Sequence, residues 1–239
     1  MTLIVYNTLT KQKETFKSLQ PNKVKLYLCG PTVYDLLHIG NFRGIVVFNC
    51  LRHWLEQHNY TVNFVLNYTD IDDKIIKRAN DNNQSTEELT QTYITAFQKD
   101  CNRLGITPHE LNPKCSDHIP HMIDFITQLI AKDHAYHIDG SVFFKIDSFK
   151  TYGKLSGKNI ADLNAGHRVD PDPRKQNPLD FILWKPAKPN EPSWDSPWGP
   201  GRPGWHIECS AMNHAHHGEQ IDIHGGGIDL IFPHHENEI

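Results

Sequence analysis

Two short stretches of alternating hydrophobic residues flank a helical pattern near the start of the chain, and this succession constrains the fold most. Val24, Leu26 and Leu28 alternate along the first stretch, and residues 62–66 alternate along the second, as in strands with one buried face. Between them, apolar residues of positions 47–55 fall on one stripe of a helix. This order predicts a parallel crossover unit. Because ligands of parallel sheets bind beyond the carboxyl ends of the strands, facing helix amino ends, we expect a site just after the first strand.

The composition is that of a globular protein without a membrane segment. With 38% hydrophobic and 22% charged residues among 239, the chain can form one large core, or a core with a smaller inserted module. No apolar run reaches the roughly 18 residues of a membrane helix, and no basic leader indicates a signal peptide. A net charge of -4 without a long basic run argues against a non-specific nucleic-acid coat protein. Five cysteines, none closely paired, fit a reducing compartment, so we expect a cytoplasmic protein without membrane contact.

Elements beyond the crossover unit do not continue its strand–helix–strand rhythm. Periodicity, capping and turn signals predict an edge strand at 2–9, helices at 73–80, 86–104, 117–131 and 205–217, a hairpin around Asp139–Gly140, and strands at 181–184 and 221–224. We assign the strand at 181–184 to the main sheet. Residues 1–110 are therefore interpreted as the first half of a sheet domain, 111–172 as an insertion, and 173–239 as the second half.

Residues 38–41, His-Ile-Gly-Asn, stand at the predicted start of the first long helix. Gly40 would let the backbone approach a phosphate closely, and His38 and Asn41 offer hydrogen-bond donors to phosphate oxygens as charge develops. The alternative is a helix cap with an incidental histidine. These four residues alone do not decide between the two interpretations.

A second candidate site consists of Cys29, Cys209, His234 and Glu238. His234 and Glu238 are four positions apart and would share one helical face, and zinc accepts thiolate, imidazole and carboxylate ligands together. Spacing alone favours three unrelated segments, because the cysteines are far apart in the chain. Further histidines would compete as ligands: His206, His217, His224 and His235.

Two remaining patterns carry less information. Three consecutive glycines at 225–227 would let a planar ring or a phosphate lie against bare backbone, or they form a flexible turn. Cys50, Cys101 and Cys115 are interpreted as small apolar residues without a function.

Taken together, these segments resemble the cysteinyl-tRNA synthetase family over nearly the whole chain. The matching stretches are Leu28-Cys-Gly-Pro-Thr-Val-Tyr-Asp, His38-Ile-Gly-Asn, Asn67-Tyr-Thr-Asp-Ile-Asp-Asp-Lys, Gly201-Arg-Pro-Gly-Trp-His-Ile-Glu-Cys-Ser and Asp222-Ile-His-Gly-Gly-Gly-Ile-Asp-Leu-Ile-Phe-Pro-His-His-Glu-Asn-Glu. The resemblance implies an α/β fold, a Rossmann-type parallel-sheet catalytic domain split by a connective insertion. It also implies ATP-dependent activation of L-cysteine to cysteinyl-adenylate, with Mg²⁺, and transfer to cysteine tRNA.

The resemblance further implies roles for individual residues. One zinc ion per chain would be held by Cys29, Cys209, His234 and Glu238 and would select the substrate thiolate. His38 and Asn41 would be catalytic, and the nucleotide would bind at Pro31, Thr32, His38, Gly40, Asn41, Gly226 and Gly227. The substrate cysteine would contact Gly30, Thr69, Trp205 and Asp229. Family members usually carry a second histidine where this chain has Asn41.

The family continues beyond the point where this sequence stops, into a Lys-Met-Ser-Lys-Ser loop and an anticodon-binding domain. We therefore expect residues 1–239 alone to be nearly inactive in aminoacylation, and we expect a monomer. Two alternatives share the same residues. One is a mycothiol-pathway ligase, which activates cysteine and passes it to an amino sugar; the other is a non-catalytic paralogue that binds zinc and cysteine.

Overall fold

The computed structural model describes residues 3–158 and 172–239 of the chain. The residues form two compact units, each assembled from separate stretches. The first unit consists mainly of residues 15–118 and 212–227, and the second mainly of residues 4–14, 119–211 and 228–239. The boundaries of these units differ from the predicted division at 110 and 172. That division stays a prediction. Part of the predicted insertion, residues 159–171, lies outside the described residues.

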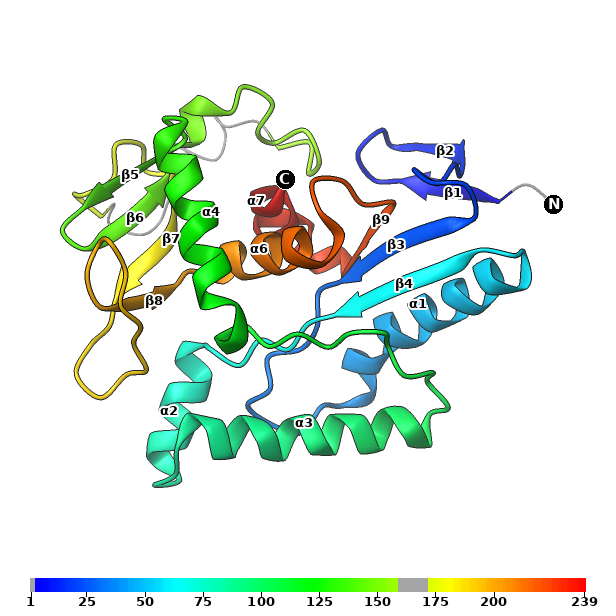
Figure 1. The fold of residues 1–239 in the computed structure, drawn as a ribbon, viewed down its shortest axis with the longest axis horizontal. Helices are drawn as coiled ribbons and strands as arrows, with labels where there is room; N and C mark the ends of the chain where they lie inside the picture. The colour runs from blue at the N-terminus through cyan, green and yellow to red at the C-terminus, as the bar shows by residue number, and fades with distance from the viewer. Residues whose placement is uncertain (1–2, 159–171) are drawn as a thin grey trace. The chain divides into compact units, whose positions relative to one another are not determined.

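A three-stranded parallel sheet forms the centre of the first unit (Figure 1). Strand β3 (Lys23–Leu28) lies between β4 (Thr61–Leu66) and β9 (Ile223–Gly225), and α1 (Ile39–Gln57) connects β3 to β4. Leu26 pairs with Phe64 on one side and with Ile223 on the other. The predicted parallel crossover is therefore confirmed. All three strands end at the same edge, which is where ligands of such sheets bind.

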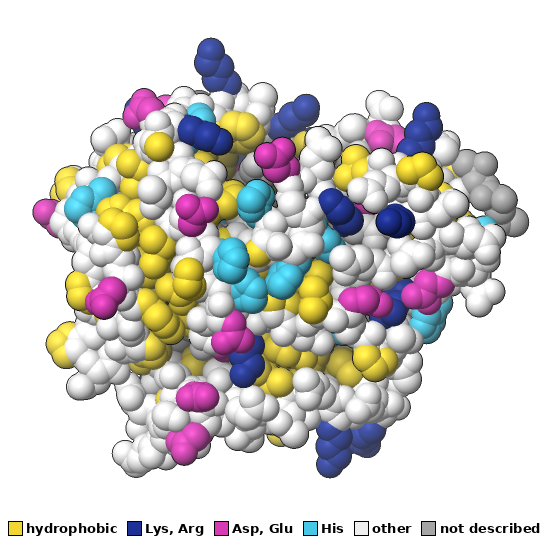
Figure 2. Space-filling model, viewed as in Figure 1, with side chains coloured by type: hydrophobic (Ala, Val, Ile, Leu, Met, Phe, Trp, Pro, Cys, Tyr) yellow, Lys and Arg dark blue, Asp and Glu magenta, His cyan; other side chains and the backbone are white. Residues whose placement is uncertain are grey.

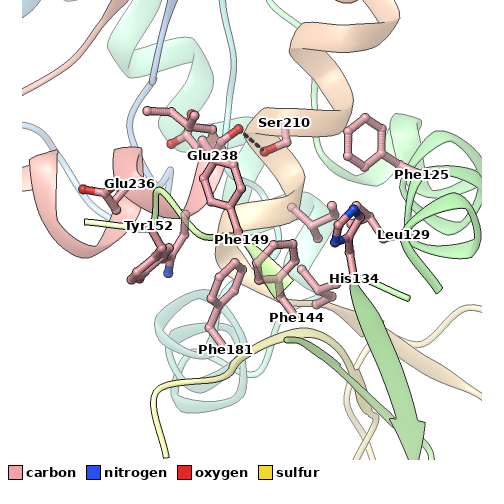
Figure 3. A pocket seen from close by; sticks show the side chains of 14 residues that line it. Phe125, Leu129, His134, Phe144, Phe149, Tyr152, Phe181, Ser210, Glu236 and Glu238 are labelled. Carbon is pink, nitrogen blue, oxygen red and sulfur yellow. Dashed lines mark hydrogen bonds between the residues drawn. The ribbon is translucent and has the colours of Figure 1, made fainter. Parts of the chain in front are cut away.

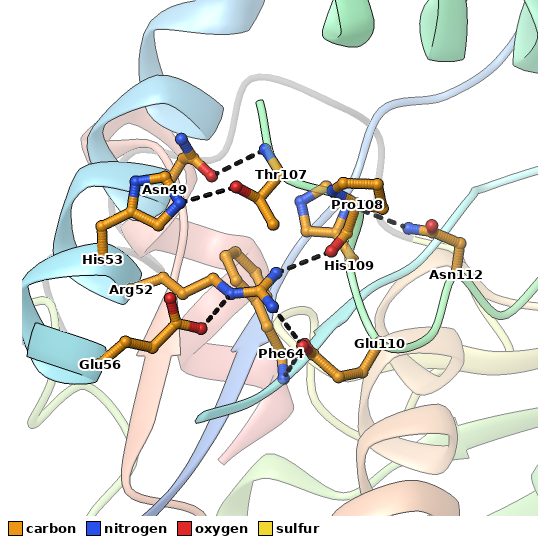
Figure 4. A network of polar contacts seen from close by, with 10 residues as sticks. All are labelled: Asn49, Arg52, His53, Glu56, Phe64, Thr107, Pro108, His109, Glu110 and Asn112. Atoms are coloured by element: carbon orange, nitrogen blue, oxygen red, sulfur yellow. Dashed lines mark hydrogen bonds and ion pairs between the residues drawn. The ribbon is translucent and has the colours of Figure 1, made fainter. Parts of the chain in front are cut away.

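The predicted apolar stripe of α1 is confirmed except at its first residue. Leu55 is in the core, and Phe48, Leu51 and Trp54 pack against it, but Val47 is 57% exposed. The polar Asn49 and Arg52 are also buried, because the segment that follows α3 supplies polar partners to this face. Asn49 accepts a hydrogen bond from the backbone N–H of Thr107 at 3.1 Å, and Arg52 belongs to the network in Figure 4.

Two further helices of the first unit begin where capping residues predict. Asp72 accepts a hydrogen bond from the backbone of Lys74 at the start of α2 (Asp73–Asp81). Ser85 and Glu88 form a reciprocal capping box at the start of α3 (Thr86–Arg103). Apolar side chains of the two helices pack together in one cluster that includes Ile75, Ala79 and Leu89.

A four-stranded antiparallel sheet forms the second unit's centre, in the order β5 (Ala135–Ile138), β6 (Ser141–Phe144), β7 (Phe181–Pro186) and β8 (Gly201–Pro203). The predicted hairpin joins β5 to β6. Its residues Asp139 and Gly140 have φ angles of 48° and 74°, as a type I′ turn requires. Assignment of the strand at 181–184 to the main sheet was wrong, because β7 pairs with β6. A short apolar run shows that a strand forms, but not which neighbour it will pair with.

The remaining elements complete the chain. They are β1 (Ile4–Asn7), which pairs with the unpredicted β2 (Gln12–Thr15) in a sheet of their own, α4 (Ile119–Ala131), α6 (Trp205–His217) and α7 (Glu236–Glu238). Short helical turns span Ser116–His118, Ile146–Ser148, Ile228–Leu230 and Ile231–His235. Among the described residues, no helix is long and apolar enough to cross a membrane. On the face in Figure 2, basic and acidic side chains are scattered rather than gathered in one patch.

Candidate metal and nucleotide sites

The carboxyl ends of β3 and β4 bring together several predicted site residues of the first unit. Val33 N–H donates to the carbonyl of Thr69 at 3.1 Å, and Thr69 N–H donates to the carbonyl of Pro31 at 3.2 Å. Thr32 and Thr69 pair as an isolated parallel bridge. Thr69 is 2% exposed, so its backbone position is set by packing and by these two hydrogen bonds. The structure therefore places Pro31, Thr32 and Thr69 side by side at the edge where a ligand is expected.

Gly30 occupies a position that no larger residue fits. A Cβ atom there would lie 1.6 Å from the carbonyl oxygen of Asn67, far inside any van der Waals contact. Gly30 N–H also donates to the side-chain oxygen of Asn67 at 2.9 Å. Sequence reasoning missed Asn67 as the residue that holds this turn. The signal was present in the cluster of polar residues at the end of β4, of which Asn67 is fully buried.

The start of α1 is compatible with both interpretations of residues 38–41, as a helix cap and as a phosphate-binding site. His38 is the N-cap: its Nδ1 accepts the backbone N–H of Gly40, and its own N–H donates to Oδ1 of Asn41, both at 3.0 Å. Because Nδ1 accepts, the proton of the neutral ring lies on Nε2. His38 is exposed, so Nε2–H is available as a donor at the positive end of a helix.

The same cap accounts for Gly40 and Asn41. A Cβ on Gly40 would lie 2.8 Å from Cε1 of His38, so a larger residue would displace the ring that makes the cap. Asn41 uses its oxygen in the cap and retains its amide N–H₂ as a donor. The three consecutive glycines at 225–227 begin at the end of β9, where Gly225 pairs with Leu28. Gly226 and Gly227 therefore lie beyond the same edge of the sheet.

Three of the four predicted metal ligands converge within the second unit. Nε2 of His234 lies 2.7 Å from a carboxylate oxygen of Glu238 and 3.6 Å from Sγ of Cys209. The side chains of His234 and Glu238 are 2% and 3% exposed, and Cys209 is 2% exposed. The expectation that His234 and Glu238 share one helical face is confirmed.

The chemistry of this cluster fits a zinc ion. Thiolate, imidazole and carboxylate are the ligands that zinc takes in proteins. Burial lowers the pKa of His234, but hydrogen bonding to Cys209 and Glu238 outweighs burial and raises this pKa to about 10. The pocket therefore favours a positive charge at the point where the three side chains meet.

His206 contacts the ring of His234 and not the carboxylate or the thiol beside it. Its Nδ1 lies 2.9 Å from Nδ1 of His234, on the side away from Cys209 and Glu238. Burial lowers the pKa of His206 to about 3, so this ring stays neutral. Trp205 stacks on His234 with ring centroids 4.1 Å apart. A ligating histidine is commonly held through its other nitrogen in this way.

Two of the other competing histidines and the fourth predicted ligand belong to the first unit. His217 and His224 belong to the first unit, where Nε2 of His217 lies 3.3 Å from the carbonyl of Leu26. Cys29 also belongs to the first unit, and its N–H donates to the carbonyl of Gly225 at 3.2 Å. Asp229 is exposed in the second unit. The roles of Cys29 as a ligand and of Asp229 as a substrate contact stay predictions.

Comparison with known proteins identifies the family. The family model of the class I tRNA synthetase (C) catalytic domain matches residues 15–239. The chain belongs to this family. It is 57% identical to the cysteine–tRNA ligase of Bdellovibrio bacteriovorus over 237 residues, which are 99% of this chain and 49% of that protein. It is 54% identical to the cysteine–tRNA ligase of Pyrococcus furiosus, over 99% of this chain and 50% of that protein. The chain thus spans about half the length of the curated relatives it matches.

Solved synthetase structures share the fold at low sequence identity. Mycobacterium tuberculosis methionyl-tRNA synthetase in complex with methionyl-adenylate superposes with a TM-score of 0.64 and 12% identity, covering 88% of this chain and 52% of that one. A putative arginyl-tRNA synthetase from Campylobacter jejuni gives a TM-score of 0.57 and 9% identity, covering 93% of this chain and 51% of that one. The α/β, Rossmann-type fold class predicted for this class I synthetase chain is therefore confirmed.

Proposed function

We propose that the protein is the catalytic part of a cysteine–tRNA ligase. It would activate L-cysteine with ATP to cysteinyl-adenylate and transfer the cysteinyl group to cysteine tRNA. The observation that carries this proposal is the buried convergence of Cys209, His234 and Glu238. Identity of 54–57% to relatives named cysteine–tRNA ligase supports it.

Adenylate formation would take place at the first unit's sheet edge. An oxygen of the cysteine carboxylate attacks the α-phosphorus of magnesium-bound ATP, the bond to the β-phosphate oxygen breaks, and pyrophosphate leaves. Nε2–H of His38 and the amide of Asn41 would donate to phosphate oxygens as negative charge develops. Pro31, Thr32, Gly40, Gly226 and Gly227 would line the nucleotide. The protein's contribution is therefore to position the reactants and to stabilise charge.

Zinc held by Cys29, Cys209, His234 and Glu238 would supply a partner that prefers the substrate's thiolate to a hydroxyl. Shape alone separates cysteine from serine by only about 1–3 kcal/mol, which is too little without an editing step. Within the chain, His206 would keep Nε2 of His234 directed to the metal. Thr69 and Asp229 would bind the substrate ammonium near Gly30, and Trp205 would close over the side chain.

A cytoplasmic monomer is part of the same proposal. None of the five cysteines forms a disulfide, which supports a reducing compartment. Cysteine-dependent exchange of pyrophosphate into ATP tests activation, and charging of cysteine tRNA tests transfer. Absence of exchange would favour a non-catalytic paralogue. Exchange with transfer to an amino sugar but not to tRNA would favour a mycothiol-pathway ligase.

A further inference from the structure

The two ligands His234 and Glu238 lie on a helical stretch that is too short to be stable by itself. This stretch, residues 233–238, is called the ligand turn; it follows the extended residue Phe232 and includes α7. It makes fewer than two helical turns, and isolated helices of this length are not stable in water. The direction of its ligand face must therefore depend on contacts made by its other faces.

Glu236 anchors the face opposite the ligands. Two positions from each ligand, it points roughly 200° around the helix axis from them. It is 3% exposed, and its carboxylate accepts three backbone N–H groups: from Gly153 at 2.9 Å, from Ser156 at 2.7 Å and from Leu155 at 3.4 Å. Successive backbone N–H groups that converge on one carboxylate form an anion nest, and such charge-assisted hydrogen bonds are strong.

The segment that donates these hydrogen bonds, residues 152–158, is called the clamp loop, and it contacts the chain around the ligand turn at two further points. Tyr152 donates its hydroxyl to Oδ1 of Asn237. The ammonium of Lys158 lies 4.8 Å from the ring centre of Phe232. Figure 3 shows Tyr152 and Glu236 near each other, with Glu238 beside Ser210 on α6.

The clamp loop is itself a closed turn. Gly157 N–H donates to the carbonyl of Gly153 at 2.8 Å. Gly153 has a φ of +92°, and a Cβ there would lie 2.3 Å from the carbonyl oxygen of Lys158. Only glycine adopts this conformation without strain, so the loop's shape depends on a residue that touches no metal ligand.

We propose that Glu236 is a positioning residue that couples metal binding at the ligand turn to the order of the clamp loop. The inference rests on the proposed function, because it takes His234 and Glu238 as zinc ligands. The coupling is reciprocal. A bound metal fixes the ligand turn and so stabilises the clamp loop, and a formed clamp loop raises metal affinity.

Cobalt and zinc affinities, measured by competition with a chelator, test the first half of the coupling. Glu236→Gln keeps the shape but loses the charge that the nest binds, and we expect it to weaken metal binding about 10- to 100-fold. Gly153→Ala should also weaken metal binding, because it changes the shape of the clamp loop. At saturating cobalt, the Glu236→Gln absorption bands should keep their wild-type positions, because the ligands are unchanged.

Glu191→Gln is the matched control. Glu191 lies in the same unit, pairs with Arg202 at 2.9 Å and accepts the backbone N–H of Lys188 at 3.2 Å, so it anchors a turn that carries no ligand. We expect its metal affinity within about twofold of wild type. An equal loss in Glu191→Gln and Glu236→Gln would overturn the inference, because general destabilisation would then explain both.

Hydrogen exchange of the wild-type protein tests the reverse direction and needs no variant to fold. Zinc should slow exchange of the amides of Gly153, Leu155 and Ser156 at least tenfold, and it should leave those of Lys188, Asn190 and Glu191 unchanged. Unchanged exchange at the clamp loop, or wild-type metal affinity in Glu236→Gln, would overturn this inference and leave the proposed function standing. A wild-type protein that binds no metal refutes the zinc site of the proposed function and the inference with it.

Discussion

A polar cluster around a buried side chain in the first unit and the Cys209–His234–Glu238 cluster of the second unit are built on opposite principles. In the first unit, Arg52 donates to Glu56 at 2.8 Å, to the carbonyl of Pro108 at 2.7 Å and to Glu110 (Figure 4). The second oxygen of Glu110 accepts the N–H of Phe64 at 2.8 Å. Donors and acceptors alternate, so the cluster is complete without any added group.

In the second unit's cluster, hydrogen-bond donors and acceptors do not alternate. The thiol of Cys209 and the carboxylate of Glu238 both face Nε2 of His234, and an imidazole nitrogen carries at most one proton for the two. A metal cation would satisfy all three groups together. Buried charge alone therefore does not indicate a ligand site, because a cluster of this kind can also be purely structural. The second cluster differs because a thiol, an imidazole and a carboxylate, all ligands that zinc takes, converge on one point.

The largest expected effect comes from removing the centre of the metal cluster. His234→Ala leaves Cys209 and Glu238 facing each other without their shared partner, so we expect bound zinc and cysteine affinity to fall together by more than a hundredfold. His235→Ala, on another helical face, should spare the metal. In the cobalt-substituted protein, cysteine should strengthen the sulfur–metal charge-transfer band and serine should not. A band that is indifferent to cysteine would mean that the metal is structural only.

A change at the start of α1 tests whether the nucleotide site is separable from the metal cluster. His38→Ala removes a donor to the phosphates, and loss of such a donor costs about 3 kcal/mol in the transition state. We expect cysteine-dependent pyrophosphate exchange to fall about a hundredfold with zinc content unchanged. His38→Asn should show the same loss of exchange while keeping the helix cap. Near-normal exchange in both variants would leave His38 with a capping role only.

Breaking the first unit's cluster should affect stability and leave the metal in place. Arg52→Met leaves Glu56 and Glu110 without their cation, and hydrogen bonds to charged groups contribute about 1.5–3 kcal/mol each. Because both glutamates are about a third exposed, we expect a total loss near the lower end of this range. Urea unfolding measures the loss, and Arg52→Met with Glu110→Gln should recover part of it. A loss of zinc in Arg52→Met would contradict the separation of the two clusters.

The effect expected to be smallest near pH 6 is a pH dependence of stability in the first unit. Burial, with a smaller contribution from Arg52, lowers the pKa of His109 from its ordinary 6.5 to about 4. The unfolded chain therefore takes up a proton between pH 6.5 and 4 while the folded chain does not. Stability should be fully present above pH 6.5 and should fall by roughly 1 kcal/mol per pH unit as the pH drops toward 4. His109→Gln should flatten this part of the profile, measured by urea midpoints.

Features that depend on neighbouring residues could be predicted from the sequence. The crossover from β3 to β4 follows from its change of hydrophobic period, and the start of α3 follows from Ser85 and Glu88. The hairpin follows from Asp139–Gly140. His234 and Glu238 share a face because four residues make about one helical turn. In each case, the physical cause lies within a few residues of the chain.

Features that join distant residues were decided by the tertiary structure. Cys209 meets His234 only because α6 packs against the ligand turn, and Asn67 fits Gly30 only because β4 pairs with β3. The same applies to Arg52, which meets Pro108 and Glu110 beyond α3, and to β7, whose sheet is determined by β6. Local patterns determine whether a helix or strand forms, since backbone conformation depends on near neighbours. Which side chains meet depends on how these elements pack, and only the folded chain determines that.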